Sequence, residues 1–124
     1  MTLKGFNIII SGGSQGLGFE VAKQFVMAGA NVMICARNIE QLVLAQKNLS
    51  LFANKNKVLI CPTDISSPAQ ISDLIANTLS ELGTIDVLVA NAGIYGTKGP
   101  IDEIDWQEWS DAIDINLKGN VCIM

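Results

Sequence analysis

Short runs of consecutive apolar residues alternate along the chain with longer segments whose apolar residues recur at helical spacing. The runs, each rich in Ile and Val and bounded by Gly, Pro, Asn or Asp, are residues 6–11, 31–36, 57–61 and 85–90. The segments between them are residues 16–28, 39–54 and 68–82. Strands buried on both faces and joined by crossover helices produce this alternation. The sequence therefore predicts βαβ units and an α/β fold with a parallel sheet.

The ends of the expected helices carry residues that favour starting or stopping a helix. Asn38, Ser67 and Asp105 each stand three residues before a Gln or Glu, as a capping side chain does at a helix start. The cap at Asp105 predicts a further element after the fourth apolar run. Gly29 and Gly83 follow the points where the first and third helices should end, a position that favours glycine.

Right-handed crossover connections determine the order of strands in such a sheet. Four parallel strands joined in this way lie in the order 3-2-1-4. This is a Rossmann-type doubly wound sheet with its ligand crevice at the carboxyl ends of strands 1 and 4. The fourth run, Ile-Asp-Val-Leu-Val-Ala, has the composition of a strand buried on both faces, yet this order places it at the edge. We therefore expect residues 1–124 to form one domain that is incomplete at its carboxyl-terminal end.

Composition excludes several classes of protein. Apolar residues make up 49% of the chain and charged residues 16%, which is typical of a globular domain. Without histidine, the chain has no Ser-His-Asp triad, Cys-His dyad or His-ligated zinc site, and we expect no metal site. A net charge of −4 without a Lys/Arg cluster argues against nucleic acid as a partner. Because the chain has neither an apolar run of about 18 residues nor a signal peptide, we expect a cytoplasmic protein without a membrane segment.

The three cysteines are Cys35, Cys61 and Cys122. The first two lie inside apolar runs, where a free cysteine behaves as a small hydrophobic residue. We therefore expect reduced thiols in the core rather than disulfides, as is usual for a cytoplasmic protein.

The segment Ser-Gly-Gly-Ser-Gln-Gly-Leu-Gly at residues 11–18 joins the first apolar run to the first helical pattern. Glycine adopts positive φ and has no Cβ, so the backbone here turns sharply and approaches a ligand closely. The helix that begins in this segment offers N–H groups and the positive end of its dipole to an anion. A tight turn without a ligand is the simpler alternative, but the context of strand, glycines and helix predicts nucleotide binding. The segment lacks the Gly-Lys-Ser/Thr end of a P-loop, which argues against an NTPase.

Four short motifs, in order along the chain, are similar to those of the short-chain dehydrogenase/reductase family. The glycines at 12, 16 and 18 resemble the family's T-G-x-x-x-G-x-G, with Ser11 in place of Thr. Asp64 and Ile65 resemble its adenine-contacting pair, and residues 91–93 read Asn-Ala-Gly, as in the family. The segment 114–119 resembles its N-x-x-G segment, and the four motifs together cover essentially the whole chain.

The resemblance implies a dinucleotide-binding Rossmann domain over residues 1–124 and a role for each matching residue. In the family's pattern the glycine turn holds the pyrophosphate, its neighbours lie near the adenosine ribose and the nicotinamide, and the later motifs contact adenine and a ribose. The cofactor-binding residues implied are Gly12, Ser14, Gln15, Gly16, Leu17, Gly18, Asp64, Ile65, Asn91, Ala92 and Gly93. Asn116 matches the Asn of the family's catalytic Asn-Ser-Tyr-Lys tetrad, where it supports a proton-relay water; a helix-interior Asn bonded to backbone is the alternative.

The Tyr-x-x-x-Lys part of that tetrad is absent from the chain. Tyr95 is the only tyrosine, the residue four positions later is Gly99, and Lys98 stands at the wrong step. The resemblance therefore implies an NAD(P)-dependent oxidoreductase that transfers hydride between nicotinamide and a carbonyl or secondary alcohol, with its catalytic acid beyond Met124. We expect this chain alone to be inactive.

The end of the second apolar run indicates the choice of cofactor. An NAD-selective enzyme has an acidic side chain there, about 20 residues after the glycines, which accepts from the ribose 2′-OH. This chain has Ala36 followed by Arg37, and a guanidinium pairs well with the 2′-phosphate of NADP. Gln15 occupies a position that is often basic in NADP-preferring members. We predict NADP (NADPH) over NAD, with ketone reduction as the reaction.

Two other functions stay open at this point. A short non-catalytic module that binds a dinucleotide or a partner chain would explain the absent Tyr-x-x-x-Lys. A methyltransferase or another nucleotide-binding α/β protein would share the glycine turn. The resemblance implies a small-molecule substrate, of unspecified identity, and a homo-oligomer for the full-length protein. Trp106 and Trp109, three residues apart on an expected helix, are interpreted as core or interface packing.

Overall fold

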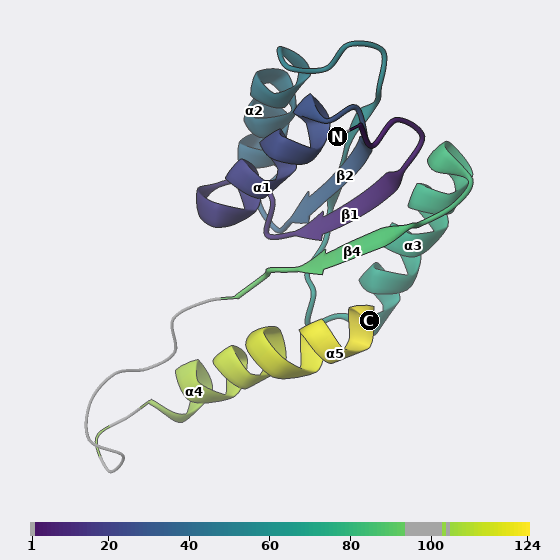
Figure 1. Cartoon of the computed structure of the whole chain (residues 1–124). Helices are drawn as coiled ribbons and strands as arrows, with labels where there is room; N and C mark the ends of the chain where they lie inside the picture. Colours follow the sequence, from purple (N-terminus) through teal and green to yellow (C-terminus); the bar gives the residue numbers. More distant parts are fainter. Residues whose placement is uncertain (1, 94–102, 104) are drawn as a thin grey trace.

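The computed structural model describes residues 2–93, 103 and 105–124, which contain a four-stranded parallel sheet (Figure 1). The strands are β1 (Asn7–Ser11), β2 (Asn31–Ala36), β3 (Val58–Pro62) and β4 (Val87–Ala90). They pair in the order β3-β2-β1-β4, with Ser11 opposite Cys35 on one side and Ala90 on the other. The predicted order of a Rossmann-type doubly wound sheet is confirmed.

Helices cover both faces of the sheet (Figure 1). They are α1 (Gly16–Met27), α2 (Ile39–Ser50), α3 (Pro68–Leu82), α4 (Trp106–Ile113), the π-helical segment η1 (Asp114–Gly119) and α5 (Asn120–Ile123). Successive residues of β1 point to opposite faces. Ile8 and Ile10 pack with α1 and α2, whereas Ile9 packs with α3, η1 and α5. Two apolar cores therefore hold the sheet between two helical layers.

Hydrogen bonds at the caps confirm the predicted helix starts. The side-chain oxygens of Asn38, Ser67 and Asp105 accept from the backbone N–H groups three residues later, at 3.0, 3.3 and 2.9 Å. Gly29 and Gly83 have φ of +95° and +87° after α1 and α3, as expected of glycines that end a helix.

The bounds of α1, β1, β3 and β4 differ from the predicted ranges by one or two residues, and α2 and the burial of β4 differ more. α2 ends at Ser50 instead of residue 54, because the N–H groups of Leu51 and Phe52 bond to carbonyls three residues back and tighten the chain into a turn. β4 is half-buried rather than fully buried, since β1 is its only partner among the described strands.

The carboxyl-terminal helical segment leaves its two tryptophans in solvent. Trp106 is 71% exposed and Trp109 41%, so the interpretation of core packing is wrong for the part of the chain that the structure describes. The two rings stack on each other with centroids 5.1 Å apart. None of the helices within residues 2–93 and 105–124 is long and apolar enough to cross a membrane.

Candidate cofactor-binding site

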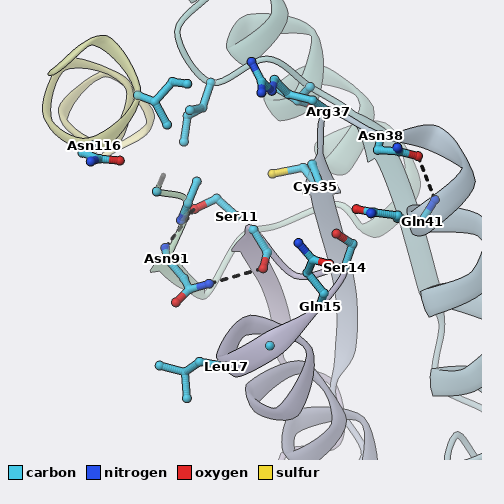
Figure 2. A pocket seen from close by; sticks show the side chains of 18 residues that line it. Ser11, Ser14, Gln15, Leu17, Cys35, Arg37, Asn38, Gln41, Asn91 and Asn116 are labelled. Atoms are coloured by element: carbon cyan, nitrogen blue, oxygen red, sulfur yellow. Dashed lines mark hydrogen bonds between the residues drawn. The ribbon is translucent and has the colours of Figure 1, made fainter. Parts of the chain in front are cut away.

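A cleft of about 920 Å³ opens at the carboxyl ends of β1, β2 and β4 and extends to η1 (Figure 2). Small-molecule sites typically enclose roughly 300–1,000 Å³. The predicted site residues that line it are Gly12, Ser14, Gln15, Gly16, Leu17, Arg37, Ile65, Asn91, Ala92, Gly93 and Asn116. Gly18 and Asp64 are not part of its lining. The fold thus brings most of the predicted residues to one crevice, at the predicted edge of the sheet.

Two glycines bring the backbone of the turn between β1 and α1 to the cleft. Gly12 and Gly16 have φ of +67° and +60°, a conformation that favours glycine. Gly18 is buried beneath the turn, where a Cβ would collide with the carbonyl oxygen of Gly12. Gly18 therefore supports the turn from below, which explains why it does not line the cleft.

The amino-terminal end of α1 faces the same cleft. The helix begins at Gly16, and the side chain of its N-cap residue, Gln15, makes no capping hydrogen bond. The first N–H groups of a helix have no partner within the helix itself, and together with the helix dipole they favour an anion. This end of the cleft is therefore suited to a phosphate group.

The hydroxyl group of Ser11 joins the turns that follow β1 and β4. It accepts hydrogen bonds from the backbone N–H groups of Asn91 (2.9 Å) and Ala92 (3.0 Å). The Asn91 side-chain amide in turn donates to the carbonyl of Gly12 at 3.3 Å. The hydroxyl thereby bonds to two successive backbone donors at the end of β4, of which the Asn91 N–H also bonds to the Val89 carbonyl at 3.1 Å. The sequence identified Ser11 only as a motif position. Its hydrogen bonds to Asn91 and Ala92 follow from the pairing of β1 with β4, which the structure shows.

Arg37 and Asp64 stand at the ends of β2 and β3. Arg37 lines the cleft, whereas Asp64 lies in a smaller adjoining cavity of about 230 Å³ that Arg37 also lines. The Asp64 carboxylate accepts from the hydroxyl (2.6 Å) and the N–H (3.0 Å) of Ser66. These hydrogen bonds, with a smaller contribution from the charge of Arg37, lower the pKa of Asp64 below its ordinary value. Asp64 is thus an ionised carboxylate beside the cleft rather than part of its lining.

Asn116 lies in η1, where the helix widens into a π-helical turn. Such turns are rare and are frequent at functional sites. A Cβ on Gly93 would come within 3.1 Å of the Asn116 side-chain oxygen, so glycine at 93 lets the chain after β4 pass close to this side chain. The structure therefore places Asn116 at the edge of the cleft next to the Asn-Ala-Gly segment.

Asn120 holds that arrangement together, and the sequence analysis missed it. Its side-chain amide donates to the carbonyls of Ala92 (3.0 Å) and Asn116 (2.9 Å), which belong to the β4 turn and to η1. The side-chain oxygen of Asn120 is buried and has no hydrogen-bond partner. Gly119 lets the end of η1 approach the loop between β3 and α3, since a Cβ there would lie 2.7 Å from the Ile65 carbonyl oxygen. No local pattern signals the contacts with Ala92 and Ile65, because they join segments far apart in the sequence.

Other lining residues that the sequence analysis did not assign to the site are Ser11, Cys35, Ala36, Asn38, Gln41, Thr63 and Ile115. Most follow directly from the topology, because they stand at or just after the carboxyl ends of strands. Cys35 and Cys61 are buried, as predicted, whereas Cys122 is exposed. Burial is the main cause that raises the pKa of Cys35 to about 12.

Within residues 2–93, 103 and 105–124, no group of three or more Cys, Asp or Glu side chains is placed to hold a metal ion. The site therefore rests on glycine backbone, amides, hydroxyls and one guanidinium. Tyr95, Lys98 and Gly99 lie outside the described residues.

Comparison with known proteins agrees with the geometry of the cleft. A family model described as short chain dehydrogenase matches residues 7–124. The short chain dehydrogenase/reductase dpmpG of Macrophomina phaseolina is 37% identical over 117 residues, which are 94% of this chain and 66% of that protein. The 3-oxoacyl-(acyl-carrier-protein) reductase FabG of Chlamydia muridarum is 40% identical over 92% of this chain and 46% of its own length.

A crystal structure of a metagenomic short-chain oxidoreductase in complex with NADP has the same fold. It superposes with a TM-score of 0.90 at 28% identity, over 99% of this chain and 55% of that one. The chain thus spans between about half and two thirds of the length of these three proteins. Because the family match runs from β1 to the last residue and includes the glycine turn, the Asn-Ala-Gly segment and Asn116, this chain belongs to the short chain dehydrogenase family.

Proposed function

We propose that residues 1–124 form the dinucleotide-binding domain of an NADPH-dependent oxidoreductase that reduces a ketone. The observation that carries the proposal is the cleft in which the glycine turn and the start of α1 meet the β4 turn, clamped by the Ser11 hydroxyl. Family members are oxidoreductases, and the name of the FabG relative describes reduction of a 3-oxoacyl group. These names support a carbonyl compound as the substrate class.

The residues present fit a dinucleotide. The backbone of Gly12 and Gly16 would hold the pyrophosphate at the start of α1, and Ser14 and Gln15 would lie near the adenosine ribose. Leu17, on one side of the cleft in Figure 2, would lie near the nicotinamide, far from Arg37 in the same view. Gly18 would support the turn from below.

The later motifs would hold the rest of the cofactor. Asp64, from the adjoining cavity, and the backbone amide of Ile65 would bracket adenine. The Asn91 to Gly93 segment would pass beside a ribose. When bound, the nicotinamide supplies or accepts the hydride. Asn116 would orient a proton-relay water, and the tyrosine and lysine of the family's tetrad would come from chain outside residues 1–124.

The preference for NADPH rests on Arg37. Its guanidinium lines the cleft at the end of β2, and Ala36 stands where an NAD-selective enzyme has a carboxylate. The solved structure with NADP supports the same choice. Titration calorimetry with NADPH and NADH tests it: we expect tighter binding of NADPH, and an Arg37→Ala variant that loses about tenfold in NADPH affinity with little change for NADH. The test uses the protein as purified from its source cell: tighter binding of NADH than of NADPH would overturn the preference, and no binding of either cofactor would overturn the function.

A non-catalytic module that binds a dinucleotide or a partner chain is the alternative to this proposal. NADPH oxidation with a panel of ketones, measured on the protein as purified from its source cell, distinguishes the two. Turnover supports the oxidoreductase. Binding of NADPH without turnover on any ketone supports the module.

A further inference from the structure

Arg37 lies between two cavities of different chemistry. The main cleft and the adjoining cavity of about 230 Å³ share Arg37 and Ile115. The smaller cavity is otherwise lined by Asp64, Ser66, Asp111 and Asp114. Its carboxylates come from the loop after β3, from α4 and from η1, so three separate elements place a carboxylate in the lining of a cavity that Arg37 also lines.

The charges around Arg37 are unbalanced. Among the described residues that line either cavity, Arg37 is the one cation, and three carboxylates share the smaller cavity with it. Asp111 accepts from the side-chain amide of Gln107 at 2.8 Å, a contact that leaves its charge intact. Asp114 pairs with Lys118 at 3.2 Å, but the lysine side chain is 73% exposed, and solvent screens such a pair strongly.

The guanidinium of Arg37 already interacts with one carboxylate of the smaller cavity, that of Asp64. The positive charge of Arg37 contributes to the lowered pKa of Asp64, after the two hydrogen bonds from Ser66. The same guanidinium is the group that our proposed function assigns to the 2′-phosphate of NADPH. A 2′-phosphate carries between about one and a half and two negative charges near neutral pH, so it would compete with the carboxylates for Arg37.

We propose that Asp111 and Asp114 are specificity-determining residues that limit the preference for NADPH by competing with its 2′-phosphate for Arg37. The inference rests on the proposed function, and it adds two residues that touch neither the pyrophosphate nor the nicotinamide. NADH has an uncharged hydroxyl in place of the 2′-phosphate. The two carboxylates therefore act on the dissociation constant of NADPH and leave that of NADH nearly unchanged.

The expected effect is modest because the groups are partly in solvent. A carboxylate about 8–10 Å from a guanidinium in a largely aqueous setting attracts it with an energy equivalent to a roughly two- to fourfold change in binding at low ionic strength, and this attraction opposes the pairing of the guanidinium with the phosphate. Neutralising both carboxylates should multiply the two effects if they act independently. High salt should reduce the effect of each variant, since exposed charges are screened within about 10 Å at 0.1 M salt.

The test uses the variants Asp111→Asn and Asp114→Asn, singly and together, and measures the dissociation constants of NADPH and NADH by titration calorimetry at low and high salt. Asparagine keeps the shape of the side chain and its ability to accept from Gln107. Glu81→Gln is the matched control. It removes one negative charge at the far end of α3, next to Leu82, whose carbonyl accepts from Asn7 at the start of β1.

We expect each aspartate variant to bind NADPH two- to fourfold more tightly at low salt, with NADH unchanged and Glu81→Gln like the unaltered chain. In an Arg37→Ala background the gain from Asp111→Asn should largely disappear. An unchanged ratio of the two dissociation constants, or an equal gain for NADH, would overturn the inference while leaving the proposed function in place. If the aspartate variants gain as much NADPH affinity in the Arg37→Ala background, the carboxylates act only by repelling the 2′-phosphate. That result would overturn the proposed competition for Arg37.

Discussion

The glycines of the turn after β1 are required for two different reasons. Gly16 needs its positive φ, but a Cβ there would meet open space. Gly18 would place a Cβ against the Gly12 carbonyl oxygen and close to the Asn91 side chain. We expect Gly18→Ala to lower the free energy of unfolding by about 2–3 kcal/mol and to abolish dinucleotide binding, because α1 must move away from β1. Gly16→Ala should cost about 1–2 kcal/mol through backbone strain alone. Urea unfolding measures both, and equal losses would contradict this distinction.

The buried thiol of Cys35 predicts a loss of stability in alkali. Its pKa is raised from 9.0 to about 12 in the folded chain, mainly by burial and also by the neighbouring Cys61. Because the unfolded thiol ionises first, the stabilising effect is complete below pH 9 and is lost as the pH rises toward 12. We expect Cys35→Ala to be less stable at neutral pH but to show a flatter decline above pH 9 in urea unfolding. Cys122→Ala, at an exposed position, should keep the slope of the unaltered chain.

Among the elements, those built from local signals could be predicted from the sequence. α3 begins at Pro68 and ends at Leu82, as predicted, because a cap, a helix-starting proline and a terminating glycine all lie within its own sequence. The strand order followed from right-handed crossovers together with the doubly wound pattern, which places β4 beside β1. The π-helical turn of η1 was not predicted, and the close approach of Gly119 to Ile65 and the bond of Asn120 to Ala92 beside it join segments far apart in the sequence.

The residues of the candidate site also divide into those that local sequence predicts and those that depend on long-range contacts. Residues of the glycine turn were predictable because one continuous segment carries them. The sequence motifs alone did not indicate that Asp64 and Gly18 lie outside the lining of the cleft. They depend on the Ser66 hydrogen bonds in one case and on packing beneath the turn in the other.

The link between η1 and the β4 turn predicts a specific effect at Asn120. Asn120→Asp would turn a carboxylate toward the carbonyls of Ala92 and Asn116, which the native amide satisfies. We expect the free energy of unfolding to fall by about 1–3 kcal/mol near neutral pH. The loss should shrink in acid, where the carboxyl group protonates and can donate. Asn48→Asp makes the same chemical change on the exposed face of α2 and serves as the control. A pH-independent loss at Asn120 would contradict this explanation.

At the scale of the whole molecule, the two helical layers differ in how far they extend beyond the sheet. α1 and α2 cover one face of the sheet, whereas α4, which continues directly into η1, extends past the sheet (Figure 1). Large apolar side chains remain exposed along this segment: Trp106, Trp109, Leu117, Val121 and Met124. β4 also lacks a second partner strand among the described residues. Apolar side chains gathered on one segment favour self-association.

We therefore expect the isolated 124-residue chain to self-associate through this segment. The stacked indoles of Trp106 and Trp109 offer the largest apolar area, and aromatic residues dominate the energetics of protein interfaces. The double variant Trp106→Gln and Trp109→Gln should weaken association at least tenfold in sedimentation experiments over a range of concentrations. Its free energy of unfolding should change by less than about 1 kcal/mol, because exposed side chains contribute little to the monomer. Leu51→Gln, at a position that is 79% exposed just after α2, should leave association unchanged. If the unaltered chain stays monomeric at every concentration, or if Leu51→Gln weakens association as much, then this segment is not the interface.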